Sequence, residues 1–213
     1  MSEPAELYDA ILKGNAKKAE EVTKAALASG LDPNELVHKY MIPAMDEVGK
    51  RFECNDYFVP ELLIAARAMK TSLALIAPHL ARTGTEPMGR VVIGTVQGDL
   101  HDIGKNLVAS MLEGGGFQVV DLGVDVPPQK FVEKAKEQEG TIVALSALLT
   151  TTMTQMRAVI KGLEEAGIRR QTKVMIGGAP ITQQYADEIG ADGFSDNASS
   201  AVSLARSLVH QAA

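Results

Sequence analysis

The chain has 213 residues and a formal net charge of -6, and its 46% hydrophobic and 23% charged residues are typical of a globular protein. The acidic balance argues against a nucleic-acid partner, because such a surface needs clustered Lys and Arg to replace the counterions of phosphate. No apolar run reaches the roughly 18 residues of a membrane-spanning helix, and the acidic N-terminus has no signal-peptide core. We therefore expect a cytoplasmic protein with no membrane contact. The single cysteine, Cys54, excludes an internal disulfide and a Cys-rich zinc site.

Residues 5–81 show only helical periodicity, with apolar residues recurring every three or four positions. Gly30 is placed to end a second helix, and the run Asp32-Pro33-Asn34-Glu35 is the N-cap signature of a third. The third helix is expected to continue despite a kink at Pro43, and a fourth follows the loop at residues 53–56. The sequence therefore predicts a four-helix bundle within about 80 residues.

The pattern changes at residues 82–87, which we interpret as a linker and a hinge between two domains. Beyond it, short β-branched runs alternate with amphipathic helices, and the expected strands lie near residues 90–97, 118–122, 141–147, 173–177 and 191–195. Strands that are each followed by a helix imply an α/β fold with a five-stranded parallel sheet, flavodoxin-like (Rossmann-like) in size and order. We therefore expect a helical domain over residues 1–85 and an α/β domain over residues 86–213.

The first expected strand leads into a polar turn at residues 98–106, and the helix that follows ends at Gly114-Gly115-Gly116. This turn lies at the carboxyl edge of the predicted sheet, where open α/β folds bind their ligands. His101 stands in it between Asp99 and Asp102, and a carboxylate that accepts a hydrogen bond from one ring nitrogen makes the other a better metal ligand. One protein ligand cannot hold a bare ion tightly. We therefore expect a metal that arrives already chelated, as in haem or a corrin.

Three other classes of site fit this turn less well. A P-loop has four residues between its glycines and a Ser or Thr after its Gly-Lys pair, whereas five residues separate Gly98 from Gly104 and Asn106 follows Lys105. A phospho-receiver domain needs an aspartate at the end of the third strand, where Ser146 stands. Only fragments of the glycine pattern of a dinucleotide site are present.

Three elements at these strand ends resemble the cobalamin-binding signature of methionine synthase, corrinoid methyltransferase proteins and B12-dependent mutases. They are Asp99-x-His101-x-x-Gly104, then Ser146-x-Leu148 after 41 residues (105–145), then Gly177-Gly178 after a further 28 (149–176). The helical half resembles the cap domain of methionine synthase and the small corrinoid proteins through Pro43-x-Met45-x-x-Val48-Gly49-x-x-Phe52 and Tyr57-Phe58-Val59-Pro60. The resemblance covers residues 5–211. Because mutase domains lack the cap, it favours the methyl-transfer branch.

The resemblance implies that cobalamin or a related corrinoid binds base-off and His-on, with His101 as the lower axial ligand of cobalt and Asp99 as the hydrogen-bond partner of His101. It implies cofactor contacts from three groups of residues. The loop group is Gly98, Asp99, Leu100, His101, Asp102, Ile103 and Gly104. The group around the buried nucleotide tail, in which Ser146 bonds a tail nitrogen, is Ser146, Leu148, Thr150, Gly177, Gly178, Ala179 and Phe194. The cap group, above the corrin, is Met45, Val48, Phe52 and Val59.

The resemblance also implies a function in methyl transfer, in pathways such as methanogenesis or acetogenesis. The chain would carry a methyl group between a substrate:corrinoid methyltransferase and a corrinoid:acceptor methyltransferase, with cobalt cycling between Co(I) and methyl-Co(III) and a reductive activator protein as a further partner. It would be the methyl-carrying subunit, with no catalytic residue of its own. Methylamines, methanol, glycine betaine and methoxylated aromatics remain open as donors. A cobalamin-dependent sensor or regulator and a fragment of methionine synthase are the alternatives.

Overall fold

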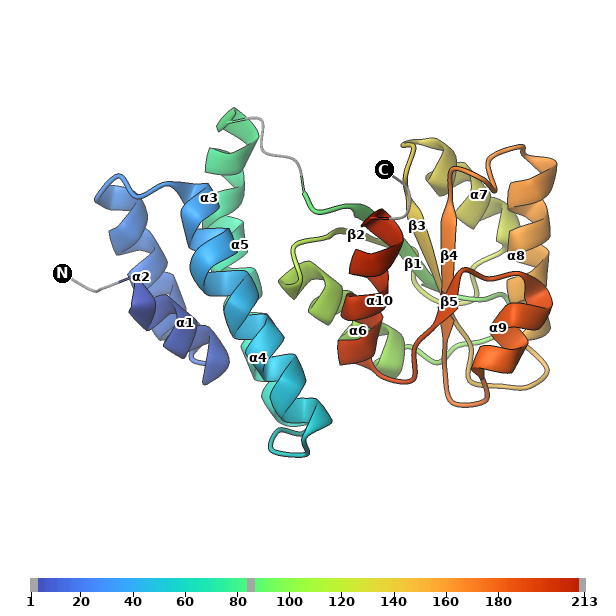
Figure 1. Ribbon diagram of the computed structural model, residues 1–213, viewed down its shortest axis with the longest axis horizontal. Helices are drawn as coiled ribbons and strands as arrows, with labels where there is room; N and C mark the ends of the chain where they lie inside the picture. Colours follow the sequence, from blue (N-terminus) through green and yellow to red (C-terminus); the bar gives the residue numbers. More distant parts are fainter. Residues whose placement is uncertain (1–3, 84–86, 211–213) are drawn as a thin grey trace. The chain divides into compact units, whose positions relative to one another are not determined.

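A computed structural model describes residues 4–83 and 87–210 of the chain (Figure 1). The chain divides into two compact units, residues 1–87 with 110–116 and residues 88–109 with 117–213, which we call the helical unit and the sheet unit. Each unit is considered separately below. The predicted domain boundary at residues 85 and 86 lies outside the described residues, as do residues 84–86 of the predicted hinge, and both remain predictions.

The helical unit contains the predicted four-helix arrangement, which is confirmed. Its elements are α1 (Ala5–Leu12), α2 (Ala16–Ala28), α3 (Pro33–Glu35), the π-helical segment η1 (Leu36–Met41), α4 (Ile42–Glu53) and α5 (Val59–Thr83). Because α3, η1 and α4 follow one another without a break, they form the single third helix that the sequence predicts. Apolar residues three and four positions apart bury one face of each long helix, among them Leu7 and Ile11 of α1 and Leu62 of α5.

Pro43 is accommodated by the π-helical turn that precedes it. A proline inside an α-helix has no N–H to donate, and its ring clashes with the carbonyl four residues earlier. Just before it, the N–H of Ile42 donates to the carbonyl of Val37, five residues back instead of four. The wider turn absorbs the disturbance, so the predicted kink takes the form of a π-helical segment at residues 36–41.

The sheet unit is a parallel α/β fold. Its strands are β1 (Arg90–Thr95), β2 (Gln118–Asp121), β3 (Ile142–Ser146), β4 (Lys173–Gly177) and β5 (Gly193–Phe194), in the spatial order β2-β1-β3-β4-β5. Its helices are α6 (Ile103–Gly114), whose residues 110–114 belong to the helical unit, α7 (Pro128–Lys136), α8 (Thr154–Glu165), α9 (Gln183–Ile189) and α10 (Ala198–His210). Figure 1 shows α6 and α10 on one face of the sheet and α7, α8 and α9 on the other. This order confirms the flavodoxin-like prediction.

The fifth strand is shorter than the predicted run of residues 191–195. The N–H of Ala191 donates to the carbonyl of Ala186 at the end of α9, at 2.9 Å, so it is not available for the sheet. The carboxylate of Asp192 accepts from the N–H of Val174, at 2.7 Å, in place of a backbone carbonyl. The strand is assigned to Gly193 and Phe194 alone, although the N–H of Asp192 still donates to the carbonyl of Val174 in β4, at 2.7 Å.

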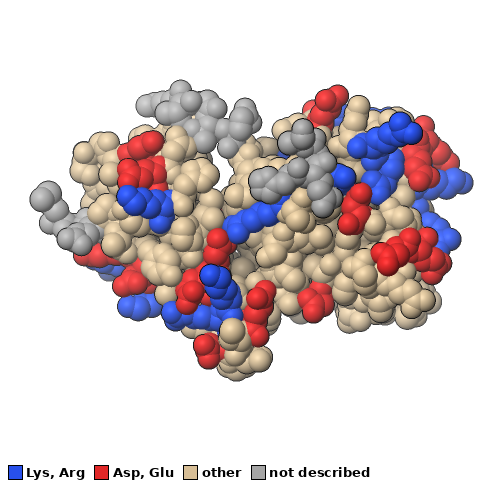
Figure 2. Space-filling view, in the orientation of Figure 1, with Lys and Arg blue, Asp and Glu red and all other residues tan. Residues whose placement is uncertain are grey.

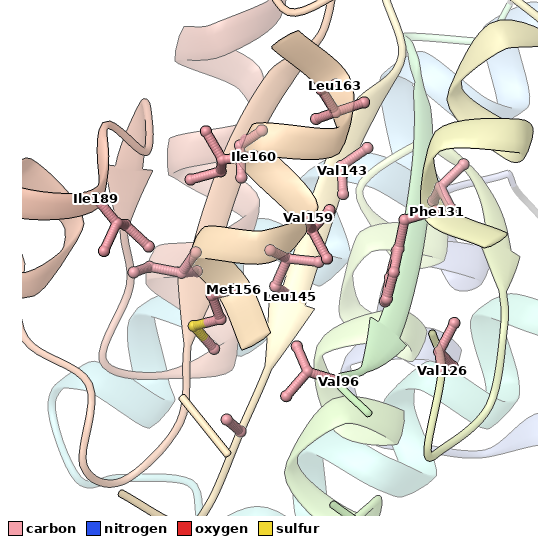
Figure 3. Close-up of a cluster of buried hydrophobic side chains, with 14 of the residues drawn as sticks. Val96, Val126, Phe131, Val143, Leu145, Met156, Val159, Ile160, Leu163 and Ile189 are labelled. Atoms are coloured by element: carbon pink, nitrogen blue, oxygen red, sulfur yellow. The ribbon is translucent and has the colours of Figure 1, made fainter. Parts of the chain in front are cut away.

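The core on the α7–α9 face of the sheet is formed by apolar side chains of the strands and of all three helices (Figure 3). Phe131 of α7 is fully buried, and the glycine opposite it in β1 is required for space. A Cβ on Gly94 would lie 2.8 Å from the Phe131 ring. Because β1 is the most buried strand of this core, the loop that follows it begins from a fixed point.

The surface carries both signs of charge. On the face that Figure 2 shows, leaving the grey residues aside, Lys and Arg are interspersed with Asp and Glu. Exposed ion pairs such as Lys161–Glu165, at 3.5 Å, contribute at most about 1 kcal/mol each. Within the described ranges, no helix has the length and apolar character that crossing a membrane requires.

Candidate functional site

The loop between β1 and α6 is fixed to a second loop, residues 121–126, which we call the brace loop. Gly98, which has φ +83°, donates its N–H to the carboxylate of Asp125, at 2.7 Å. The N–H of Asp125 in turn donates to the carbonyl of Asp99, at 3.0 Å. The start of the turn that carries His101 is therefore held by Asp125, through its carboxylate and through its backbone N–H.

Asp99 is completely buried, and its carboxylate accepts five hydrogen bonds. One oxygen accepts from the backbone N–H of His101 at 3.1 Å and from its ring Nδ1 at 2.7 Å. The other accepts from the N–H groups of Leu148 and Leu149 at 2.8 and 3.3 Å and from the Thr152 hydroxyl at 2.7 Å. Burial raises the pKa of Asp99, but these hydrogen bonds outweigh it and hold the pKa far below its ordinary value. Asp99 is therefore ionised and acts only as an acceptor.

The imidazole of His101 is oriented with Nε2 available for a ligand. Because the ionised Asp99 only accepts, Nδ1 carries the ring proton, and the lone pair of the neutral ring is on Nε2. The buried hydroxyl of Thr95 donates to the His101 carbonyl at 2.8 Å, so the backbone of the residue is fixed as well. The side chain is 52% exposed. This is the arrangement of a metal-ligating histidine with its tautomer set by a carboxylate.

Large apolar side chains on the segments that are joined to the Asp99–His101 turn remain exposed. We call them the apolar rim, and they are Leu100, Ile103, Val124, Leu148 and Leu149. Leu100 and Ile103, at 73% and 83% exposure, flank His101 in the loop, while Leu148 and Leu149 follow β3 and donate to Asp99. Exposed apolar residues gathered around one polar group indicate a ligand surface that is itself largely apolar. A chelated metal in a broad macrocycle fits this donor set.

The residues predicted to surround the nucleotide tail lie at the same edge of the sheet. Ser146 ends β3 and is paired in register with Thr95 of β1 and Gly177 of β4. Phe194 of β5 is paired with Ile176 and packs partly against the core. Leu148, Thr150, Gly178 and Ala179 are exposed in the loops that follow β3 and β4. The structure therefore brings together residues that are about 50 positions apart in the sequence.

The two glycines after β4 are explained by the packing of the strand ends. Gly178 has φ +131°, and a Cβ there would lie 1.9 Å from the carbonyl oxygen of Ala147. A Cβ on Gly177 would lie 3.1 Å from the carbonyl oxygen of Ser195. The sequence predicts close approach of the nucleotide tail at these glycines, and the structure shows close approach of neighbouring backbone. Their contact with the tail remains a prediction.

The four predicted cap residues differ in exposure within the helical unit. Val59, at the start of α5, is exposed, and Phe52 of α4 is half-buried. Met45 and Val48 are buried, and packing in the interior is enough to explain these apolar residues. Their contact with the corrin therefore remains a prediction. Phe58, which stands in the quoted cap motif but not among the predicted contacts, is exposed, and its N–H donates to the carboxylate of Glu61 at 2.9 Å just before α5.

The sequence analysis missed Thr152 and the brace loop. Thr152 stands in a run of three threonines after β3, at the edge of the sheet where a site is expected, and that position was the available signal. The sequence does not say which threonine reaches Asp99. The turn after β3 decides it, since the N–H of Thr152 donates to the carbonyl of Leu149 at 3.1 Å.

Replacing Thr152 by valine keeps the shape of the side chain and removes one donor to Asp99. We expect the free energy of unfolding to fall by about 1.5–3 kcal/mol, because a hydrogen bond to a buried charge is lost. Urea denaturation of the full chain measures this. Thr154→Val is the control, since the Thr154 hydroxyl donates only to the Thr151 carbonyl in an exposed turn. Equal effects of the two substitutions would contradict the role given to Thr152.

Comparisons with family models agree with this geometry. Residues 89–203 match a B12 binding domain, and residues 5–77 match a second family with the same description. The first match covers the β1–α6 loop, the brace loop and the ends of β3 and β4. The second covers helices α1 to α4 and most of α5.

Curated proteins and solved structures show the same relationship over the whole chain. Trimethylamine corrinoid protein 1 of Methanosarcina acetivorans is 49% identical over 96% of both chains, and dimethylamine corrinoid protein 3 of that organism is 43% identical over 96% of this chain and 95% of its own. The crystal structure of a cobalamin-binding protein from Desulfitobacterium hafniense DCB-2 is 34% identical, with a TM-score of 0.79 over 98% of this chain and 99% of that one. The methanol:cobalamin methyltransferase complex of Methanosarcina barkeri is 28% identical, with a TM-score of 0.85 over 96% of this chain and 78% of that one. The predicted resemblance is confirmed, and the chain belongs to the family of B12-binding corrinoid proteins.

Proposed function

We propose that this protein carries a methyl group on the cobalt of a bound corrinoid, between a substrate-specific methyltransferase and a second methyltransferase. The observation that carries the proposal is the His101 imidazole, whose Nδ1 is bonded to the buried Asp99 and whose Nε2 is available within the apolar rim. The identity with methylamine corrinoid proteins over 96% of the chain supports a carrier over a cobalamin-dependent regulator.

The residues of the sheet unit have distinct tasks in this proposal. His101 would bind cobalt through Nε2 in a base-off, His-on complex, and Asp99 fixes the ring tautomer. The apolar rim would contact the macrocycle and exclude water from the metal. When bound, the corrinoid supplies a cobalt centre that accepts and releases a methyl group.

The remaining predicted contacts complete the proposed site. Ser146, Thr150 and Ala179 line a slot for the detached nucleotide tail at the ends of β3 and β4, with Leu148 and Phe194 beside it. Phe52 and Val59 of the helical domain, residues 1–85, shelter the upper face of the corrin. The hinge at residues 82–87 moves this cap aside when a partner binds.

The methyl donor that we propose is a methylamine. The named relatives at 43–49% identity are trimethylamine and dimethylamine corrinoid proteins, whereas the methanol system is represented by a structure at 28% identity. The partners would then be a methylamine:corrinoid methyltransferase, a corrinoid:acceptor methyltransferase and a reductive activator protein. The cytoplasmic location remains a prediction from the sequence.

Reconstitution of the full chain tests this function. The purified protein is incubated with hydroxocobalamin under reducing conditions, and we expect one corrinoid per chain with its visible spectrum. The loaded protein is then mixed with a methylamine:corrinoid or a methanol:corrinoid methyltransferase and the matching donor. We expect methylation of the carrier only with the first enzyme. A protein that remains colourless would contradict the carrier function, whereas methylation from methanol alone would contradict only the proposed donor.

A further inference from the structure

Lys105 is a buried cation that the proposed function leaves without a task. Its side chain is 2% exposed, although it lies in the first turn of α6, four residues after His101. The ammonium group donates to the carboxylate of Asp121 and to the side-chain oxygen of Asn106, the latter at 2.6 Å. Burying a charge costs several kcal/mol before its partners offset that cost. An apolar residue of similar size at this position would avoid the cost. A buried lysine here therefore calls for an explanation beyond packing.

The acceptors of Lys105 belong to two segments that hold the His101 turn. Asp121 ends β2 and begins the brace loop, and its second carboxylate oxygen accepts from the N–H of Gly123 at 2.9 Å. The carbonyl of Gly123 accepts from the N–H of Thr95 at 3.0 Å. Thr95 is the residue whose hydroxyl holds the His101 carbonyl. Three hydrogen bonds thus lead from the Lys105–Asp121 pair to the backbone of His101.

A second connection passes through Asn106. While its side-chain oxygen accepts from Lys105, its amide donates to the carboxylate of Asp102 at 3.0 Å. Its backbone N–H donates to the Asp102 carbonyl at 2.8 Å, so the residue next to His101 is fixed twice. The brace loop acts from the opposite side through Asp125 and its bonds to Gly98 and Asp99. One ammonium group is therefore linked to both segments that fix the turn.

We propose that Lys105 is a positioning residue, whose paired ammonium group holds the His101 turn and the brace loop in the arrangement that lets Nε2 bind cobalt. The inference rests on the proposed function, since it concerns the same lower ligand. Lys105 itself touches neither the imidazole nor the exposed surface, so it acts only through Asp121, Asn106 and the hydrogen bonds that follow them.

The test compares the full-length wild type with Lys105→Met, which keeps an unbranched side chain that is one atom shorter and removes its charge. Both proteins are loaded with hydroxocobalamin, reduced to the Co(II) state and studied by electron paramagnetic resonance. A bound imidazole nitrogen splits the cobalt lines into triplets, and ¹⁵N-labelled histidine turns the triplets into doublets, which shows that the ligand is a histidine of the chain. We expect Lys105→Met to bind the corrinoid and to show about tenfold fewer imidazole-ligated centres than the wild type.

Val159→Ala is the control for stability. It removes buried side-chain atoms from α8 in the core on the α7–α9 face of the sheet, whereas Lys105 lies on α6 at the other face, and we expect it to lower the melting temperature while keeping the nitrogen splitting. If Lys105→Met does not fold, Asp121→Asn replaces it in the test. We expect this variant to show about threefold fewer imidazole-ligated centres than the wild type.

Each outcome decides the inference. Wild-type splitting in Lys105→Met, or in Asp121→Asn where that variant is needed, would overturn it. An equal loss in Val159→Ala would overturn it too, because the loss would then follow from destabilisation. A wild type without nitrogen splitting would refute His101 as the lower ligand and the inference with it. This result is distinguishable from the others because it is obtained with the wild-type protein alone.

Discussion

His101→Ala should remove the axial nitrogen from the bound cobalt and slow methyl transfer by about 10- to 100-fold. The expected loss is large because the structure prepares this one ring for ligation, with Nδ1 bonded to Asp99 and the backbone carbonyl held by Thr95. Electron paramagnetic resonance of the Co(II) form measures the ligand, and a methyl-transfer assay with both methyltransferases measures the rate. Because the side chain is half exposed, added imidazole should enter the vacated position and restore part of the nitrogen splitting.

The control for this variant is His79→Ala, which removes an exposed imidazole from α5. We expect it to bind corrinoid and transfer methyl groups like the wild type. If His101→Ala kept the wild-type nitrogen splitting, another residue would be the lower ligand, and the proposed function would lose the observation on which it is built.

Asp99→Asn should destabilise the sheet unit by about 1.5–3 kcal/mol and weaken corrinoid binding by about 10- to 100-fold. The carboxylate accepts hydrogen bonds on both oxygens, from His101 on one side and from Leu148, Leu149 and Thr152 on the other. The asparagine amide has one acceptor oxygen and one NH₂ group, which only donates. In either orientation of the side chain, the NH₂ group faces N–H or O–H donors. Urea denaturation and corrinoid titration measure the two effects.

The pH dependence of Asp99→Asn provides a further check. The pKa of Asp99 is held below its ordinary value of 3.8, so its contribution to stability is complete above that pH and is lost as the pH falls below it. The difference in unfolding free energy between the wild type and Asp99→Asn should therefore be larger at pH 7 than at pH 3. Asp102→Asn is the control, since this exposed carboxylate accepts one side-chain bond from Asn106. A difference that does not change with pH would contradict the role given to the ionised carboxylate.

Periodicity and strand-end position were enough to predict the elements of this fold. β1 was predictable from its short β-branched run, and every residue of the strand is buried in the structure. The helices of the first half were predictable because their apolar residues recur at helical spacing. The sequence is less informative where the local structure depends on which partner a backbone group bonds. At the start of β5 the Asp192 carboxylate replaces a backbone carbonyl and the Ala191 N–H bonds to the end of α9, and Pro43 is preceded by a π-helical turn; a spacing rule describes neither feature.

The candidate site likewise has residues that the sequence predicts and residues that it does not. His101 and Asp99 were predictable as a pair, because they are two residues apart in one turn and their residue types fit a ligand and its acceptor. The other partners of Asp99 were not, because they come from the loop after β3, whose turn selects Thr152 from three threonines. Gly178 was predicted for its proximity to a ligand, whereas the structure explains it by the carbonyl of Ala147. Such contacts depend on how two strand ends meet in space.

The partners of Asp99 also determine when the site forms during folding. Its carboxylate joins residues separated by 49 to 53 positions, and the β3 segment that supplies them pairs directly with β1. Long-range parallel pairing is slow, because the intervening chain loses much of its freedom before the contacts form. On the ribosome, the carboxylate has no buried environment until residue 152 has emerged and β3 has joined β1. A partly synthesised chain is thus unable to present a prepared histidine to a corrinoid.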